Sequence, residues 1–219
     1  MVTLTVALLG GESSGKTALA TALHQTLHDT HGIRSAVVPE HLRAWCEARG
    51  RAPEAHEQAA IAAEQTRLIE AARQLPGVAV VIADTTALMV AAYSALVFND
   101  TALLPPALEQ QRRYDLSLLM GLDIPWQADG LFRDSAEMRE ATDALLRREL
   151  QAAGIGFQTV YGQGGARLQQ ALRAIGARLG RPLVHDDPAL ATGRGNWTCD
   201  NCSDPECEHR LFTGLLSRV

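Results

Sequence analysis

Lysine is almost missing from this sequence. Lysine and arginine together number 20 among 219 residues, and Lys16 is the only lysine. Guanine-specific GTPases carry the motif N-K-x-D, which cannot occur here because Gly15 precedes that single lysine. No second lysine is available to take over a role of Lys16.

The sequence also has no long apolar run. None approaches the ~20 residues that span a bilayer, and the N-terminus leads directly into a strand-like segment with neither a basic stretch nor a cleavage site. We therefore expect a cytoplasmic protein without a membrane partner.

Basic charge is not in excess either. The formal net charge is -5 at pH 7, whereas binding to the phosphates of a nucleic acid favours an excess of Lys and Arg. A nucleic-acid partner is therefore not expected. With 47% hydrophobic and 21% charged residues, the composition is typical of a soluble globular protein.

Cysteines are few, and their distribution is uneven. Of four cysteines, Cys46 stands alone, whereas Cys199, Cys202 and Cys207 lie close to His209 within eleven residues. In a cytosolic protein such a cluster indicates a metal before it indicates disulfides. Three thiols and one imidazole satisfy tetrahedral Zn²⁺, so we predict a structural zinc site in a tail that has no core of its own.

Alternatives to that zinc site stay open. They are unligated thiols, a redox pair of Cys199 and Cys202, or His185 in place of His209 as the fourth ligand. The role of the tail is also open between structure, regulation and the binding of a protein partner or a second copy of the chain.

The most informative feature that the sequence does contain is one glycine-rich stretch. Residues 10–17 match G-x-x-x-x-G-K-[ST] between an apolar strand at 4–9 and a helix that starts near 18. Backbone N–H groups and the helix N-terminus would bind phosphate oxygens, Lys16 would reach the β- and γ-phosphates, and Thr17 would hold Mg²⁺. The predicted ATP-binding residues are Gly10, Gly11, Glu12, Ser13, Ser14, Gly15, Lys16 and Thr17.

Two acidic residues follow predicted strands. Asp84 ends the apolar run 78–83, where it would bind Mg²⁺ or cap a helix that starts near Ala87. Glu40 follows the strand 33–38, where it would face the phosphate loop or favour the positive end of a helix.

The order of elements predicts the fold. Strands at 4–9, 33–38, 78–83, 116–120 and 157–161 alternate with helical segments that end near 28 or cover 53–74, 87–98, 135–153 and 166–179, plus a short one through 112–113. Such alternation predicts a right-handed, mostly parallel, three-layer α/β domain with a five-stranded sheet. We place this domain at residues 1–181 and a linker with the Cys-rich tail at 182–219. Residues 99–106 are expected to form a loop.

Residues 121–134 combine Pro, Gly, Asp, an aromatic residue and Arg, a composition suited to a mobile lid. From that lid Arg133 would stabilise a migrating phosphoryl group, or it would be an ordinary surface arginine.

These motifs together resemble a known family. The phosphate loop, the pair Glu40 and Arg43, the strand ending in Asp84-Thr85, and Asp123-Ile124-Pro125-Trp126-x-x-Asp129-Gly130 are similar to the ribosylnicotinamide kinase domain of the bifunctional NAD-biosynthesis and regulator proteins, also described as an AAA-type ATPase domain. The likeness covers residues 4–180. The segment Pro39-Glu40 to Trp45 also resembles the Glu–Trp segment of the deoxynucleoside kinases.

The resemblance implies transfer of the γ-phosphoryl group of ATP to the 5′-hydroxyl of a nucleoside, nicotinamide riboside first among them, with NMN as product. It implies Glu40 as the base, although Asp84 stays an alternative. The implied catalytic residues are Lys16, Glu40, Asp84 and Arg133; the implied substrate contacts are Glu40, Arg43, Trp126 and Asp129.

We expect this chain to depart from the family pattern, without the upstream adenylyltransferase and DNA-binding domains and with the added tail. The competing interpretation is an ATPase switch that docks a protein partner through that tail.

Overall fold

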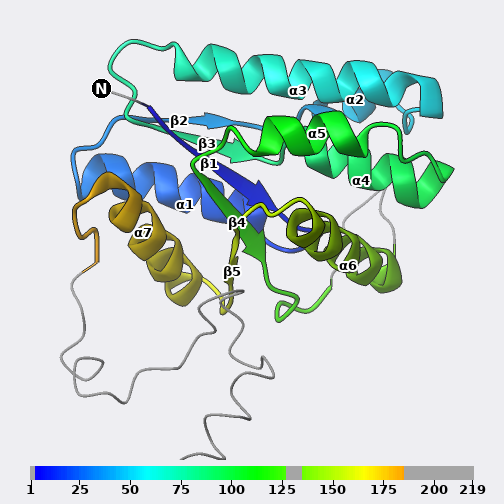
Figure 1. Ribbon diagram of the computed structural model, residues 1–219. Helices are drawn as coiled ribbons and strands as arrows, with labels where there is room; N and C mark the ends of the chain where they lie inside the picture. The colour runs from blue at the N-terminus through cyan, green and yellow to red at the C-terminus, as the bar shows by residue number, and fades with distance from the viewer. Residues whose placement is uncertain (1–2, 127–134, 185–219) are drawn as a thin grey trace, which may run out of the picture.

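The computed structural model describes residues 3–126 and 135–184. Along the described chain, each strand is separated from the next by one or more helices (Figure 1). They are β1 (Leu4–Leu9), α1 (Lys16–Asp29), β2 (Ser35–Val38), α2 (His41–Arg49), the 3-10 turn η1 (Ala55–Glu57), α3 (Gln58–Arg73), β3 (Val80–Asp84), α4 (Ala87–Phe98), α5 (Leu104–Gln111), β4 (Leu116–Met120), α6 (Ala136–Ala152), β5 (Gln158–Val160) and α7 (Gly165–Leu179).

The strands form one five-stranded sheet in the order β2-β3-β1-β4-β5, and every pairing is parallel. The predicted α/β class and the predicted parallel five-stranded sheet are therefore confirmed. Because β1 lies in the centre, the loops after β3, β1 and β4 meet at one edge of the sheet. Register pairs Leu8 with Asp84 and Leu9 with Leu119 near that edge.

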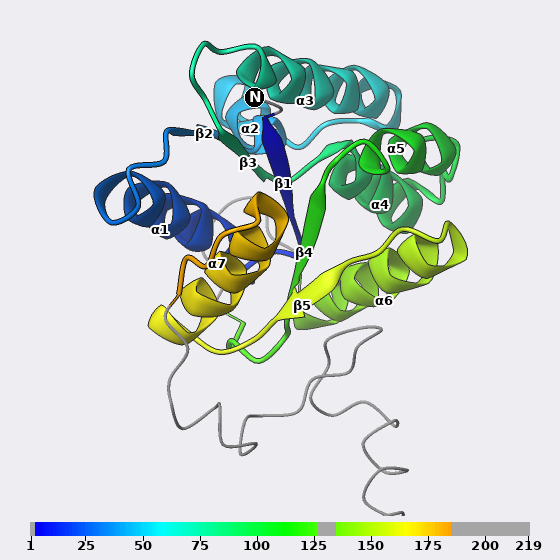
Figure 2. The same ribbon diagram turned by 60° about the vertical axis from the view of Figure 1, so that its left-hand side comes forward.

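Helices cover both faces of the sheet. Figure 2 shows α1 and α7 together on one side and α3, α4, α5 and α6 on the other. Alternate residues of β1 point to opposite faces, so Val6 and Leu8 pack with α1 and α7, whereas Leu9 packs with the helices of the second side. Both faces of the central strand are buried, which explains why all of its residues except Thr5 are apolar.

Several element boundaries differ from the sequence prediction. The structure adds α2, and it starts α5 at Leu104 inside the segment expected to be a loop. Pro105 and Pro106 lie in the first turn of α5, where the missing N–H groups have no helical partner to lose. The helix expected from residue 53 begins only at Gln58.

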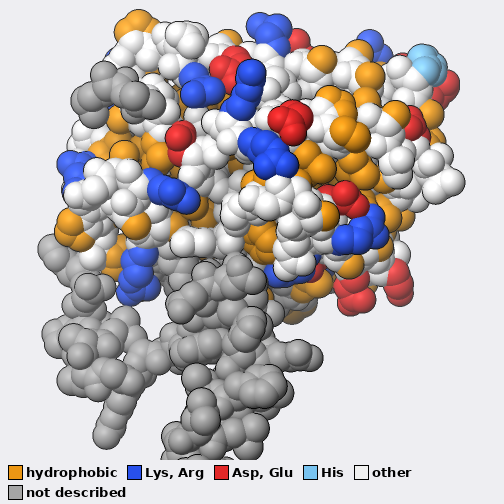
Figure 3. Space-filling model, in the orientation of Figure 1, with side chains coloured by type: hydrophobic (Ala, Val, Ile, Leu, Met, Phe, Trp, Pro, Cys, Tyr) orange, Lys and Arg blue, Asp and Glu red, His pale blue; other side chains and the backbone are white. Residues whose placement is uncertain are grey.

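The described chain continues slightly past the predicted domain boundary at residue 181. Leu183 is 6% exposed and packs in the same apolar cluster as α1 and α7. On the face drawn in Figure 3, acidic and basic side chains are interspersed among apolar and polar ones. Within residues 3–126 and 135–184, no helix is both long and apolar enough to cross a membrane.

Candidate functional site

The phosphate loop lies where the sequence places it, between the end of β1 and the start of α1. Gly15 has the left-handed φ of 81° and forms the N-cap of α1, so the positive helix end opens directly behind the loop. The Lys16 side chain is buried in the loop, and its Nζ donates to the carbonyl oxygens of Gly10 at 2.7 Å and Gly11 at 3.0 Å. The Lys16 ammonium is therefore held at the loop by carbonyl oxygens of the protein itself.

Neighbouring elements pack tightly on this loop. A Cβ at Gly11 would come within 2.8 Å of Cγ and 3.1 Å of Cα of Arg139, on α6. A Cβ at Gly15 would lie 3.3 Å from Cδ1 of Ile124, which follows β4. Glycine at position 11 is thus required by the approach of α6 and not only by phosphate, which sequence reasoning did not anticipate.

Thr17 and Asp84 meet beside the loop. Thr17 Oγ1 donates to Oδ2 of Asp84 at 2.6 Å, and Asp84 is 3% exposed at the end of the neighbouring strand β3. Its second oxygen, Oδ1, is buried and makes no hydrogen bond within the described part of the chain. Because a hard cation prefers oxygen ligands and Mg²⁺ needs few from protein, the hydroxyl and carboxylate fit Mg²⁺ bound together with phosphates.

The capping role considered for Asp84 belongs to another residue. Thr86 is the N-cap of α4, and its hydroxyl accepts from the Leu88 N–H at 3.3 Å. Between them Thr85 has a φ of 76° although it is β-branched and 2% exposed. Backbone strain of this kind persists only where the surrounding structure enforces it. The conformation of Thr85 separates the carboxylate of Asp84 from Thr86, the N-cap of α4.

Glu40 lies at the same edge of the sheet. It is the N-cap residue of α2, but its side chain makes no capping hydrogen bond. Its carboxylate is 3.7 Å from the Arg43 guanidinium, and the Glu40 side chain is 18% exposed against 52% for Arg43. Burial, followed by the charges of Glu40 and Glu12, raises the pKa of the Cys46 thiol. The two carboxylates therefore lie near one thiol, one from the phosphate loop and one from the end of β2.

Trp45 is part of the packed core and not an open platform. It is 9% exposed on α2, with the guanidinium of Arg49 at 4.3 Å and that of Arg51 at 5.0 Å from its ring centroid. Contacts of this kind stabilise the ring through cation–π attraction.

Other predicted residues lie only partly within the described chain. Trp126 is half-buried, and its Nε1 is buried without a hydrogen-bond partner in residues 3–126 and 135–184. Asp129, Arg133 and the zinc ligands Cys199, Cys202, Cys207 and His209 lie outside the described residues. No group of three or more His, Cys, Asp or Glu suited to a metal occurs among the described residues.

Two buried arginines at the loop had not been identified from the sequence. Arg139 donates to the carbonyl oxygens of Ile124 at 2.8 Å and Leu122 at 3.0 Å, and Arg167 donates to that of Ser14 at 2.5 Å. A signal did exist for Arg167, because it shares the helical spacing of the buried Ala171 and Ala174 on α7. A charged residue on an apolar stripe indicates a specific buried partner.

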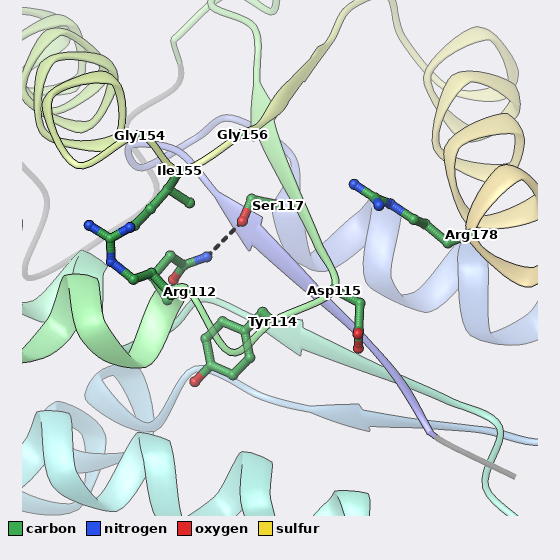
Figure 4. A pocket seen from close by; sticks show the side chains of 9 residues that line it. Arg112, Tyr114, Asp115, Ser117, Gly154, Ile155, Gly156 and Arg178 are labelled. Atoms are coloured by element: carbon green, nitrogen blue, oxygen red, sulfur yellow. Dashed lines mark hydrogen bonds between the residues drawn. The ribbon is translucent and has the colours of Figure 1, made fainter.

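A separate hollow lies at the opposite edge of the sheet. It measures about 330 Å³ and is lined by residues around the starts of β4 and β5, with Ser117 and Tyr114 between Arg112 and Arg178 (Figure 4). Burial raises the pKa of Tyr114 to about 12, so the phenol stays neutral. In this hollow Gln111 donates to Ser117 Oγ at 2.9 Å. It lies apart from the residues assembled around the phosphate loop.

Comparisons with known proteins agree with this arrangement. A family model described as "AAA domain" matches residues 5–167, whereas a search of curated proteins found no match. Two solved structures of NadR protein, one in complex with NAD and AMP-PNP and one with NR, superpose with TM-scores of 0.65 and 0.69 at 19% and 20% identity. Each alignment covers 85% of this chain, but only 51% and 54% of the NadR chains.

Thymidylate kinase from Ehrlichia chaffeensis is also similar in structure. Its TM-score is 0.52 at 12% identity, over 74% of this chain and 90% of that chain. At such identities the likeness establishes only that this chain shares the α/β fold of these proteins. This chain spans about half the length of the NadR chains that it matches.

Proposed function

The protein belongs to the AAA-domain family that matches residues 5–167, and from this premise we propose that it is an ATP-dependent nucleoside kinase. It transfers the γ-phosphoryl group of ATP to the 5′-hydroxyl of a nucleoside. The observation that carries the proposal is the hydrogen bond of 2.6 Å between Thr17 and the buried Asp84, next to Lys16 in the phosphate loop. This is the set of groups that phosphoryl transfer requires: backbone donors, one cation and two oxygen ligands.

Each group at the loop has a separate role. The N–H groups of residues 10–17 and the Lys16 ammonium hold the β- and γ-phosphates, and Thr17 with Asp84 holds Mg²⁺. When bound, Mg²⁺ neutralises charge on the phosphate oxygens. The low exposure of Lys16 and Asp84, 8% and 3%, strengthens these electrostatic interactions because little water screens them.

Glu40 acts on the acceptor. Its carboxylate orients the 5′-hydroxyl and takes the hydroxyl proton late in a loose transition state. The nucleoside oxygen bonds to the γ-phosphorus as the bond between that phosphorus and the β–γ bridging oxygen breaks, and ADP departs. Arg43 Nε lies 3.7 Å from Glu40 Oε2, where it helps to orient this carboxylate.

We propose nicotinamide riboside as the nucleoside, with NMN as product. Support comes from the resemblance carried by residues 123–130 and from the shared fold with NadR, one structure of which is a complex with NR. In this proposal Trp126 offers an aromatic face to the cationic pyridinium ring, Arg43 and Asp129 are the further substrate-binding residues, and Arg133 would stabilise the migrating phosphoryl group.

The test is a panel of nucleosides that includes nicotinamide riboside, each incubated with ATP·Mg²⁺ and the purified protein. We expect monophosphate formation, detected by mass, with one ADP released per product and little ADP without nucleoside. Steady ATP consumption that no nucleoside increases would contradict the kinase and indicate an ATPase switch instead.

We also propose that the tail binds one structural Zn²⁺ through Cys199, Cys202, Cys207 and His209. The support is the sequence alone, since C-x-x-C brings two sulfurs onto one turn and the other two ligands follow within seven residues. Four protein ligands leave no open position, so this zinc would stabilise the tail and take no part in phosphoryl transfer.

A further inference from the structure

Arg167 lies buried between the phosphate loop and the end of β4. It belongs to the first turn of α7, is 3% exposed, and donates from Nη1 to the Ser14 carbonyl oxygen at 2.5 Å. Its Nη2 donates to Asp123 Oδ1 at 2.7 Å and to the Gly121 carbonyl oxygen at 3.3 Å. One side chain from the C-terminal part of the fold thus binds a loop formed more than a hundred residues earlier.

Asp123 extends this contact to a third segment. While Oδ1 accepts from Arg167, Oδ2 accepts from the Gly162 N–H at 2.5 Å, in the turn between β5 and α7. The ion pair therefore joins the phosphate loop, the end of β4 and the β5–α7 turn. Only the planar guanidinium provides donors in a fixed fork for such a set, because a lysine ammonium is a single flexible point charge.

The hydrogen bond to Ser14 determines how the loop presents its donors. In a planar trans peptide the carbonyl and the following N–H point in opposite directions. With the Ser14 carbonyl directed to Arg167, the Gly15 N–H points away from Arg167, at the N-terminus of α1. Fixing this one peptide in advance orients a donor for a phosphate oxygen.

The arrangement depends on both charges. Burial lowers the pKa of Arg167, and the neighbouring Asp123 raises it again. The Arg167 side chain is 4% exposed and that of Asp123 34%, so removing the carboxylate would leave a buried guanidinium without its charged partner. Arg167 Nε makes no hydrogen bond within residues 3–126 and 135–184. In that part of the chain, the hydrogen bonds of Arg167 therefore come from its terminal nitrogens, Nη1 and Nη2.

We propose that Arg167 and Asp123 are a positioning pair that holds the phosphate loop in its anion-binding geometry and couples it to the β5–α7 turn. Neither side chain touches the reacting atoms; both act through Ser14, Gly15 and Gly162. The proposal rests on the proposed function only in that the loop binds ATP.

The test compares Arg167→Met, Arg167→Lys and Asp123→Asn with the unaltered protein by ATP titration, by KM for each substrate and by thermal melting. We expect Arg167→Met to raise the Kd for ATP by about tenfold or more, since hydrogen bonds to a charged donor are lost. The KM for the nucleoside should change less than about twofold at saturating ATP. Asn at 123 has one acceptor oxygen for two donors, so it should shift the Kd in the same direction.

The matched control is Arg147→Met on α6. Arg147 also pairs with an aspartate, Asp143, at 2.8 Å and is partly buried, and it donates to Thr159 Oγ1 at 3.2 Å on β5. It should lower the melting temperature and leave the Kd for ATP unchanged. In the double variant Arg167→Met with Asp123→Asn, the effects should not add, because they remove one shared interaction.

Several results would overturn the pair. If Arg167→Lys and Asp123→Asn fold and bind ATP as the unaltered protein does, the pair has no positioning role. If these variants lower the melting temperature but leave the Kd for ATP unchanged, the pair is a packing contact only. If the unaltered protein binds no ATP, both the proposed function and the positioning pair are refuted. If it binds ATP but phosphorylates no nucleoside, only the kinase function is refuted, and the ATP titrations still test the pair.

Discussion

Lys16 is held by the loop that it serves. Its Nζ hydrogen bonds to the carbonyl oxygens of Gly10 and Gly11 keep the ammonium at the mouth of the loop. Phosphate oxygens are stronger acceptors for an ammonium than neutral carbonyls are. Binding of a triphosphate would therefore exchange these partners without moving the charge far.

We predict that Lys16→Ala lowers turnover by about a hundredfold or more, because a positioned charge at the migrating phosphoryl group is lost. The fold should survive, because the buried Lys16 side chain bonds to two carbonyl oxygens of its own loop and contributes no apolar core contact. Turnover and circular dichroism check this, with the exposed Arg67→Ala on α3 as control. Undiminished phosphorylation by folded Lys16→Ala would remove Lys16 from the mechanism.

Glu40 and Asp84 should separate by phenotype. We predict that Glu40→Gln reduces turnover while the Kd for ATP·Mg²⁺ persists, because the amide cannot accept the hydroxyl proton. Asp84→Asn should instead raise the Mg²⁺ concentration needed for half-maximal rate, because it removes a charged oxygen ligand. Rates measured over a range of Mg²⁺ concentrations at saturating ATP distinguish the two variants. Exchanged phenotypes would assign the base to Asp84 and reject the present roles.

At the scale of elements, α7 packs at both of its ends. Its first turn carries Arg167 to the phosphate loop, and near its other end the returning chain crosses over Gly176. A Cβ on Gly176 would lie 2.7 Å from the Arg181 carbonyl oxygen and 3.0 Å from the Leu183 nitrogen. These are backbone atoms, which cannot turn aside as a flexible side chain does.

We predict that Gly176→Ala destabilises the protein by about 1–3 kcal/mol, as overpacking does, although alanine is normally the better helix former by about 1 kcal/mol. Gly165→Ala is the control, because a Cβ there meets nothing within 4 Å in the same helix. Urea unfolding measures both. Stabilisation by Gly176→Ala would show that residues 181–183 do not pack as described.

At the scale of the whole molecule, the four cysteines divide into two environments. Cys46 is 7% exposed, and burial raises the pKa of its thiol, so it should react slowly with thiol reagents. The other three belong to the proposed zinc site. Reactivity of all four can therefore be measured in one experiment.

We predict about one zinc per chain in protein purified without chelator, because the tail has no other source of folding free energy. Cys202→Ser should lose the metal and leave ATP binding intact. Chelation should expose three fast thiols while Cys46 stays slow. Protein that carries no zinc and has three freely reactive tail thiols from the start would refute the site.

The sequence by itself determined the fold class and the position of the phosphate loop. Both follow from local patterns: apolar runs mark the buried parallel strands, and the glycine-rich residues 10–17 lie directly between a strand and a helix. Asp84 was also accessible, because a residue that ends a central parallel strand lies at the same edge as the loop after its neighbour. The tertiary structure then showed that β3 is the direct neighbour of β1, which brings Asp84 to Thr17.

Only the tertiary structure decided which side chains support the loop. Arg167 and Ser14 are 153 residues apart. No local sequence pattern encodes the packing of α7 against α1 that brings them together. Likewise, α6 excludes a Cβ at Gly11, and the chain at 181–183 excludes one at Gly176. Sequence periodicity reports whether a residue is buried, but the partner of a buried charge is set by packing between elements distant in the chain.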